Sequence, residues 1–136
     1  MVKGIAHICI RVADLETTRR FYIDALGLKQ AFAFVRNGEM CGYYFEAGNR
    51  NFLEFFKRNP DEAISGSPVH HFCLEVDSID DTSARLKKAG FAVTDKMLGA
   101  DHSWQAWVND PDGVKIELHE YTPESCQHTG ADCILH

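Results

Sequence analysis

An internal repeat of 63 to 64 residues constrains this chain more than any other feature. His7 and His71 lie 64 residues apart near the start of two similar segments, and Glu54 and Glu117 lie 63 residues apart near the ends of those segments. Each segment is too short to bury a sheet by itself, so two segments of the same plan should pair around a shared core. The repeat therefore predicts a duplicated architecture.

The first segment predicts the order βαβββ. A strand is expected over 5–12, and Asp14 is the expected N-cap of a helix that ends at Gly27. Asn37-Gly38 is a strong hairpin signal between two further strands. The expected strands after the helix are 29–36, 40–47 and 51–57.

The plan then starts again after a polar, proline-containing stretch over 58–68 that is typical of a linker. Ser78 is expected to cap a helix that ends at Gly90. Asp-Pro-Asp-Gly at 110–113 is strong turn chemistry before an alternating strand that carries Glu117. The expected strands of this segment are 69–76, 91–97, 104–109 and 114–120. We therefore expect one α+β domain made of module one (4–57), the linker (58–68), module two (69–121) and a loosely held tail (122–136).

Composition excludes several classes of partner. The formal net charge of −6 and the lack of a basic run argue against nucleic acid or an anionic membrane as the partner. No apolar stretch approaches the roughly 20 residues of a membrane span. The N-terminus enters a strand pattern at once, so no signal peptide is expected. The five cysteines are scattered, which favours reduced thiols in a cytoplasmic protein.

The repeat also places chemistry-bearing residues at equivalent positions. A lone histidine on a strand is more often packed, and a lone glutamate is more often at the surface. The repeat nevertheless places two histidines, His7 and His71, at equivalent positions and does the same for two glutamates, Glu54 and Glu117. Each of these residues lies on the less apolar face of its strand. Two imidazoles and two carboxylates suit a divalent cation, with positions left for water or substrate. The pattern therefore favours a metal site.

These motifs resemble the vicinal oxygen chelate superfamily and, within it, glyoxalase I. The resemblance rests on the paired modules, on Asp110-Pro-Asp-Gly-Val-Lys-Ile-Glu117 and on the sequences around the two histidines, and it spans about residues 5–121. It implies a cupped, incomplete eight-stranded barrel around one divalent ion: Ni²⁺, Zn²⁺ or Co²⁺ first, with Mn²⁺ or Fe²⁺ as further candidates. His7, Glu54, His71 and Glu117 would bind the metal. Glu117 would be the catalytic base, with Glu54 acting on the opposite face, in a homodimer that acts on a small molecule.

The implied chemistry is an isomerase or lyase reaction of the glyoxalase I type. A divalent ion that holds two vicinal oxygens acidifies the C–H between them, and a ligand carboxylate can move that proton to the neighbouring carbon. The hemithioacetal of methylglyoxal and a thiol is the first candidate substrate. The alternatives are an epimerase or extradiol-type dioxygenase on the same scaffold, or a metal-free protein that binds an antibiotic or another small molecule.

Substrate recognition is the weaker part of the resemblance. Arg11 stands where glyoxalase I has an arginine that faces the glutathione carboxylate, although a structural ion pair is an equal alternative. Glyoxalase I usually has asparagine where this chain has Arg58, and its Lys-Gly-Gly run is replaced by residues 99–103. His119 shares a strand face with Glu117; a surface histidine is the preferred interpretation and a residue that orients a ligand is the alternative. Cys9 and Cys73 are expected to be small packing residues.

Overall fold

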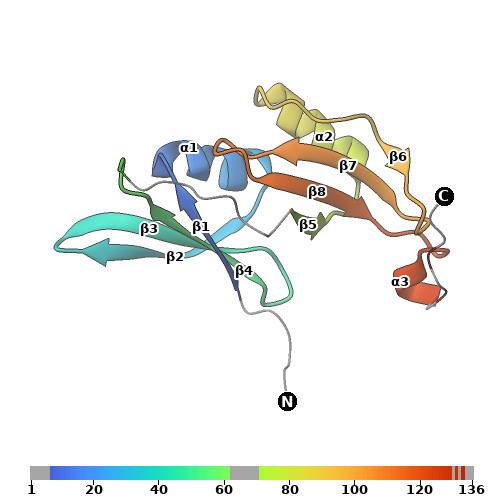
Figure 1. The fold of residues 1–136 in the computed structure, drawn as a ribbon, viewed down its shortest axis with the longest axis horizontal. Helices are drawn as coiled ribbons and strands as arrows, with labels where there is room; N and C mark the ends of the chain where they lie inside the picture. The colour runs from blue at the N-terminus through green and yellow to red at the C-terminus, as the bar shows by residue number, and fades with distance from the viewer. Residues whose placement is uncertain (1–6, 62–70, 130, 132, 134–136) are drawn as a thin grey trace, which may run out of the picture. The chain divides into compact units, whose positions relative to one another are not determined.

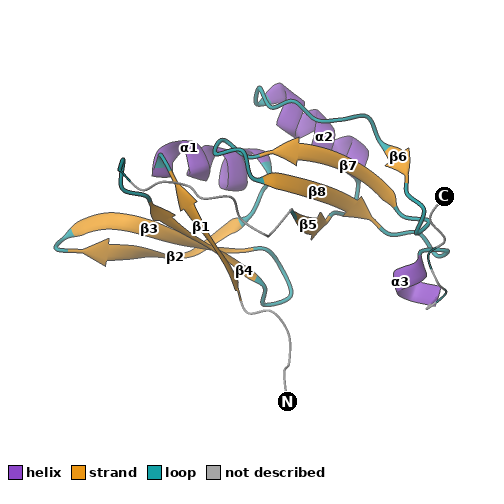
Figure 2. Ribbon diagram, viewed as in Figure 1, coloured by secondary structure: helices purple, strands orange, loops and turns teal. Residues whose placement is uncertain are grey.

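The computed structural model describes residues 7–61, 71–129, 131 and 133. The chain divides into two compact units, residues 1–67 and 68–136, and each unit carries its own four-stranded sheet. Residues 5–6 and 69–70 of the expected strands, 62–68 of the expected linker and part of the expected tail lie outside the described residues. Figure 1 labels the elements, and Figure 2 shows helices and strands in different colours.

Unit one has the predicted order of elements. They are β1 (His7–Val12), α1 (Leu15–Arg19), a π-helical continuation η1 (Arg20–Ala25), β2 (Lys29–Arg36), β3 (Glu39–Glu46) and β4 (Phe52–Lys57). The sheet order is β1-β4-β3-β2, with β1 parallel to β4 and the other pairs antiparallel.

Unit two repeats this topology. Its elements are β5 (Phe72–Glu75), α2 (Ile79–Lys88), β6 (Met97–Leu98), β7 (Trp104–Asn109), β8 (Lys115–Glu120) and α3 (Cys126–Thr129). The sheet order β5-β8-β7-β6 matches that of unit one, and β5 is again parallel to the strand beside it. The predicted α+β class and the duplicated βαβββ plan are confirmed.

Local sequence signals explain where most elements begin and end. The Asp14 carboxylate accepts a hydrogen bond from the Thr17 amide at 2.8 Å and caps α1. Asn37 and Gly38 both have positive φ (52° and 78°), as the tight turn between β2 and β3 requires. Asp110 Oδ1 accepts from the Val114 amide at 2.8 Å, which orders the turn before β8.

Each sheet has one face covered by its helix and one face free of it. In unit one the covered face is fully buried at Val12, Phe45 and Phe55, and the Tyr22 ring packs on Phe55 with centroids 4.6 Å apart. Side chains alternate along a strand, so Glu54, next to Phe55, belongs to the opposite face. Glu54 therefore lies on the sheet face that the helix leaves uncovered.

The predicted regular strand over 91–97 is wrong for residues 91–96. Regular pairing covers only Met97–Leu98, preceded by one isolated pair, Val93 with Val108. The Trp107 amide donates to Thr94 Oγ1 at 2.9 Å, so a side chain takes the place that a backbone carbonyl would hold in a regular ladder.

The expectation of a loosely held tail is also wrong for residues 122–129. Ser125 is fully buried, and the Ser103 and Ser125 hydroxyls lie 2.8 Å apart. The Cys126 amide donates to the Asp101 carbonyl at 2.9 Å at the start of α3. Hydrogen bonds to a distant loop hold this part of the tail, and local composition does not reveal them.

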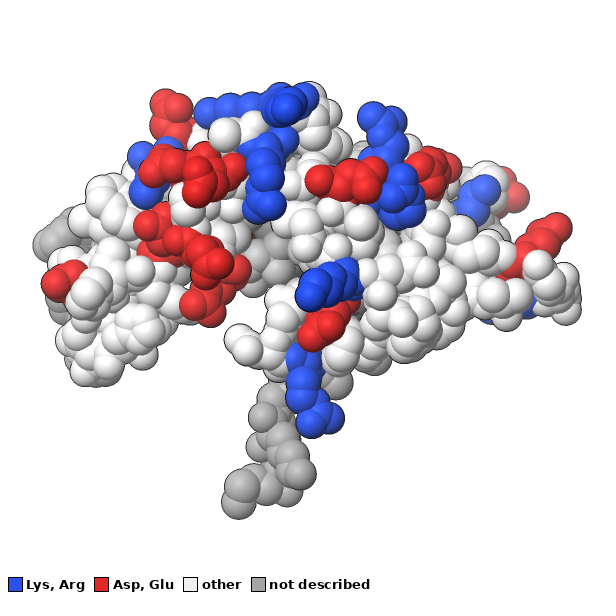
Figure 3. All heavy atoms as spheres, turned by 180° about the vertical axis from the view of Figure 1, so that it is seen from behind, with Lys and Arg blue, Asp and Glu red and all other residues white. Residues whose placement is uncertain are grey.

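Two findings bear on the kinds of partner. Among the described residues, no helix has the length and apolar character needed to cross a membrane. On the face drawn in Figure 3, acidic and basic side chains of the described residues are interspersed, so this face presents no extended basic surface for nucleic acid.

Candidate functional site

Glu117 lies in the middle of the unit-two sheet, on the face that α2 leaves uncovered. β8 places it opposite Cys73 of β5 on one side and opposite Trp107 of β7 on the other. Its side chain is 13% exposed. A carboxylate in such a position is costly to bury unless polar groups surround it.

His71 supplies one of these polar groups. Its Nε2 atom lies 3.4 Å from Glu117 Oε2. The His71 ring meets the Trp107 ring edge to face, with centroids 4.9 Å apart, and this packing orients the imidazole. The structure therefore brings together two of the predicted ligands, His71 and Glu117.

His119 is the second polar neighbour of Glu117, and the preferred interpretation of it as a surface residue is wrong. His119 is 7% exposed. Its Nε2 atom lies 3.2 Å from Asp101 Oδ2, and its Nδ1 atom lies 3.6 Å from Glu117 Oε1. The Nδ1 atom is buried and has no hydrogen-bond partner among the described residues. The arrangement matches the alternative interpretation, in which His119 orients the carboxylate.

Cys73 completes a group of possible metal ligands. Single donor atoms of Cys73, Glu117 and His119 all lie within 4.8 Å of one another. Cys73 is exposed, so its expected role as a packing residue is wrong. Although much of the residue is accessible, partial desolvation of its thiol and then the negative charge of Glu117 raise the pKa of Cys73 to about 12. Nitrogen, oxygen and sulfur donors at these distances from one another fit a divalent cation.

Unit one has the equivalent pair. Cys9 lies opposite Glu54 in the parallel β1–β4 ladder, as Cys73 lies opposite Glu117 in the β5–β8 ladder. Burial and a hydrogen bond with Glu54 raise the pKa of the Cys9 thiol. The backbone of His7 pairs with Phe52, while the His7 side chain lies outside the described part of the structure. The set of four ligands therefore stays a prediction.

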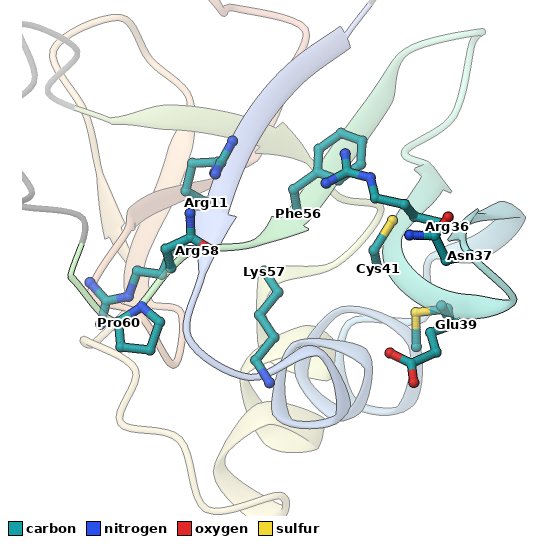
Figure 4. Close-up of a pocket in the computed structure, with 11 residues that line it drawn as sticks. Arg11, Arg36, Asn37, Glu39, Cys41, Phe56, Lys57, Arg58 and Pro60 are labelled. Carbon is teal, nitrogen blue, oxygen red and sulfur yellow. The ribbon is translucent and has the colours of Figure 1, made fainter.

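Arg11 lies in a groove of about 650 Å³ on unit one. The Arg58 amide donates to the Val12 carbonyl at 2.8 Å, which extends the β1–β4 pairing and keeps Arg58 beside β1. Arg36 also lines the groove (Figure 4). Four basic residues, Arg11, Arg36, Lys57 and Arg58, and one acidic residue, Glu39, line it, so the groove is locally cationic in an acidic protein.

Sequence reasoning missed Asp101, Arg36 and this grouping of arginines. At Arg58 and Asp101 the chain departs from the glyoxalase I pattern. These departures are the sequence feature that could have identified both residues as candidates. His102, in the same loop as Asp101, is exposed and has a positive φ of 63°. Its carbonyl accepts a hydrogen bond from the Thr122 hydroxyl at 2.7 Å, which anchors the tail.

Comparisons with known proteins identify the family of this chain. A sequence profile of the Glyoxalase/Bleomycin resistance protein/Dioxygenase superfamily matches residues 4–118. A "Probable lactoylglutathione lyase" of Synechocystis sp. is 31% identical over 84% of this chain and 92% of its own length. A "Probable trivalent organoarsenical cleaving enzyme" of Bacillus subtilis is 28% identical over 82% of this chain and 76% of its own length.

The fold is similar to that of solved structures. The crystal structure of an antibiotic binding protein from Streptomyces sp. CB03234 aligns with a TM-score of 0.73 at 21% identity, covering 89% of this chain and 98% of that protein. A match at this identity supports the fold alone. Since the profile spans most of the chain, the protein belongs to the Glyoxalase/Bleomycin resistance protein/Dioxygenase superfamily.

Proposed function

We propose that this protein is a divalent-metal-dependent isomerase or lyase of the glyoxalase I type. His7, Glu54, His71 and Glu117 are the proposed ligands, and Glu117 is the proposed base. The substrate class is a hydroxy-carbonyl compound, such as the hemithioacetal of methylglyoxal and a thiol, which becomes the hydroxyacyl thioester. The resemblance to glyoxalase I extends the proposal to a cytoplasmic homodimer.

The observation that carries the proposal is the environment of Glu117. His71 and His119 approach its two carboxylate oxygens at 3.4 and 3.6 Å on the uncovered face of a sheet. Imidazoles beside both oxygens of a mostly buried carboxylate suit a metal ligand that also moves a proton. The relatives named lactoylglutathione lyase support the same type of reaction.

The chain's own residues account for the proton transfer. A bound divalent cation would polarise the two vicinal oxygens of the substrate and acidify the C–H between them. Glu117 takes this proton and returns it to the neighbouring carbon. Glu54 is the proposed acid–base group on the opposite face of the substrate. His119, held by Asp101, keeps the Glu117 carboxylate in position, and no redox change is required.

Metal content and proton exchange test the proposal together. Protein purified without added ions should hold about one divalent ion per set of four ligands, and His71→Ala should lose most of it. The metal-loaded protein should incorporate solvent deuterium at the substrate carbon during turnover. Unchanged metal content in His71→Ala would refute the ligand assignment. A folded, metal-free protein that binds small molecules without turnover would instead identify a binding module.

A further inference from the structure

Unit one carries five aromatic side chains on the sheet face that also bears Glu54. Residues paired across strands project from the same face. One row of paired positions runs Phe32, Tyr44, Glu54 and Cys9, and the next runs Phe34, Gly42, Phe56 and Arg11. Phe52, two residues before Glu54, shares this face. We call Phe32, Phe34, Tyr44, Phe52 and Phe56 the aromatic face.

The aromatic face is continuous. The Phe32 and Tyr44 rings stack with centroids 4.6 Å apart and planes 15° apart. Tyr44 also stacks with Phe52 at 4.9 Å. Phe34 meets both Phe32 at 5.3 Å and Phe56 at 4.6 Å. The rings therefore form one surface across β2, β3 and β4, and Glu54 lies beside its centre.

Gly42 allows Phe34 and Phe56 to come into contact across β3. A Cβ atom at position 42 would lie 2.8 Å from Phe56 Cδ1 and would also collide with the Phe55 carbonyl oxygen. The absence of a side chain lets Phe56 and Phe34 lean toward each other across β3. A glycine used in this way indicates that the contact between these rings is built into the sheet.

The aromatic face is accessible, unlike the core on the opposite side of the same sheet. Phe32 is 48% exposed, whereas Phe45 and Phe55 on the helix-covered face are fully buried. The other four rings of the aromatic face are half-buried. A contiguous, partly exposed apolar surface is typical of a binding site. Planar rings in stacked and edge-to-face arrangements favour a planar aromatic ligand over an aliphatic one.

The cationic groove adjoins the aromatic face, because Phe56 belongs to both. Arg11 is the register partner of Phe56. Figure 4 shows Arg11 and Arg58 on one side of the groove and Arg36 on the other, while Lys57 points away from Arg11. An arginine fork recognises a carboxylate by paired hydrogen bonds. The aromatic face and the groove together fit a molecule with a planar ring and an acidic group.

We propose that unit one binds an aromatic carboxylate, with its ring on the aromatic face and its carboxylate in the groove beside Arg11 and Arg58. This inference rests on the proposed function, in which Glu54 is part of the reacting centre. It adds that the substrate of this centre is an aromatic carboxylate. Binding of the ring and of the carboxylate does not require the metal, so this inference can be tested separately from the chemistry.

The test measures Kd values on the full chain after chelator treatment, by calorimetry or NMR titration. The probes are 2-naphthoate, its saturated counterpart decahydro-2-naphthoate, and the uncharged 2-naphthamide. We expect 2-naphthoate to bind roughly 2- to 10-fold more tightly than the saturated acid, because only the planar ring stacks. We expect it to bind roughly 10- to 100-fold more tightly than the amide, because the amide lacks the charge that the arginines recognise.

Matched variants assign the two contacts. Phe32→Leu keeps an apolar side chain at an exposed position and should remove the preference for the planar ring, while Phe91→Leu in unit two should not. Arg58→Gln should remove most of the preference for the charged probe, while Arg20→Gln should not. Equal affinity for the planar and saturated acids, no detectable binding of 2-naphthoate at millimolar concentration, or equal effects of Phe32→Leu and Phe91→Leu would each overturn the inference. None of these results would change the conclusions drawn from the metal content and the deuterium exchange. If Phe32→Leu fails to fold, the Kd values of the three probes for the parent protein still test the inference.

Discussion

His119 and Asp101 are joined by a 3.2 Å contact between Nε2 and Oδ2. The same Asp101 oxygen accepts a hydrogen bond from the Gln127 side-chain amide at 2.7 Å. One carboxylate oxygen thus connects the 99–103 loop, β8 and α3. This loop is where the chain departs from the glyoxalase I pattern, and its replacement residue positions the histidine that faces Glu117.

Glu117→Gln should preserve the fold and lower the rate of solvent-deuterium exchange at the substrate carbon by about 10²- to 10⁴-fold, because an amide cannot accept the proton. Part of the metal should remain, since the side-chain carbonyl can still coordinate. The measurement is NMR-detected exchange at equal metal loading, with Glu124→Gln at an exposed position as the control. Exchange at the parent rate would exclude Glu117 as the base.

Asp101 should make stability depend on pH in the acidic range. Burial raises the pKa of its carboxyl, but hydrogen bonds from Gln127 and Ser103 outweigh burial, so the pKa lies below the ordinary 3.8. A carboxylate with a lowered pKa stabilises the fold above its unfolded-state pKa, and this contribution disappears as the pH falls through the folded-state pKa.

Asp101→Asn should therefore be less stable than the parent at neutral pH and should lose less stability between about pH 5 and pH 2. Urea unfolding across this range measures the effect, and Asp95→Asn at an exposed position is the control. Parallel pH profiles for the parent and Asp101→Asn would contradict the role given to these hydrogen bonds.

Arg11→Ala should raise KM for a carboxylated substrate by roughly 10- to 100-fold, because charge-assisted hydrogen bonds contribute about 1.5–3 kcal/mol. The free energy of unfolding should change little, since Arg11 is exposed. Arg20→Ala is the matched control. The same assays should show weak activity on the methylglyoxal–glutathione adduct beside the adduct of a smaller carboxylated thiol. A high kcat/KM for the glutathione adduct would refute this restriction.

Gly42→Ala should destabilise the protein by about 1–3 kcal/mol, because the new methyl group overpacks against the Phe56 ring and the Phe55 carbonyl. Denaturant unfolding measures the loss. The loss in free energy of unfolding caused by Gly42→Ala should be smaller in a Phe56→Leu background, because leucine leaves more room for the new methyl group. Equal costs in the two backgrounds would show that the ring contributes nothing to the constraint.

Ser83→Ala should stabilise the protein by about 1 kcal/mol. The Ser83 hydroxyl is buried in α2 without a hydrogen-bond partner among the described residues, and alanine removes this polar group while favouring the helix. Ser78→Ala in the same helix is the opposite case, because Ser78 accepts from the Asp81 amide at 3.1 Å as the N-cap; it should cost about 1 kcal/mol. If both substitutions shift the free energy of unfolding in the same direction, the opposite roles given to the two hydroxyls are wrong.

The sequence by itself determined the features that depend on near neighbours. Strand alternation, the Asn37-Gly38 turn and the caps at Asp14 and Ser78 act over a few residues, so the order of elements could be predicted correctly. The duplication then placed Glu54 and Glu117 at equivalent positions, because a strand with one buried face has its register set by that face.

The tertiary structure alone decided the features made by residues remote in sequence. Thr94 interrupts the expected strand by accepting from Trp107, and Asp101 reaches His119 and the tail through side-chain contacts that no local pattern encodes. The aromatic face needs Phe34 and Phe56 to meet across Gly42, on strands joined by turns. Local propensity cannot specify such contacts, because their energy arises only when the chain has brought the partners together.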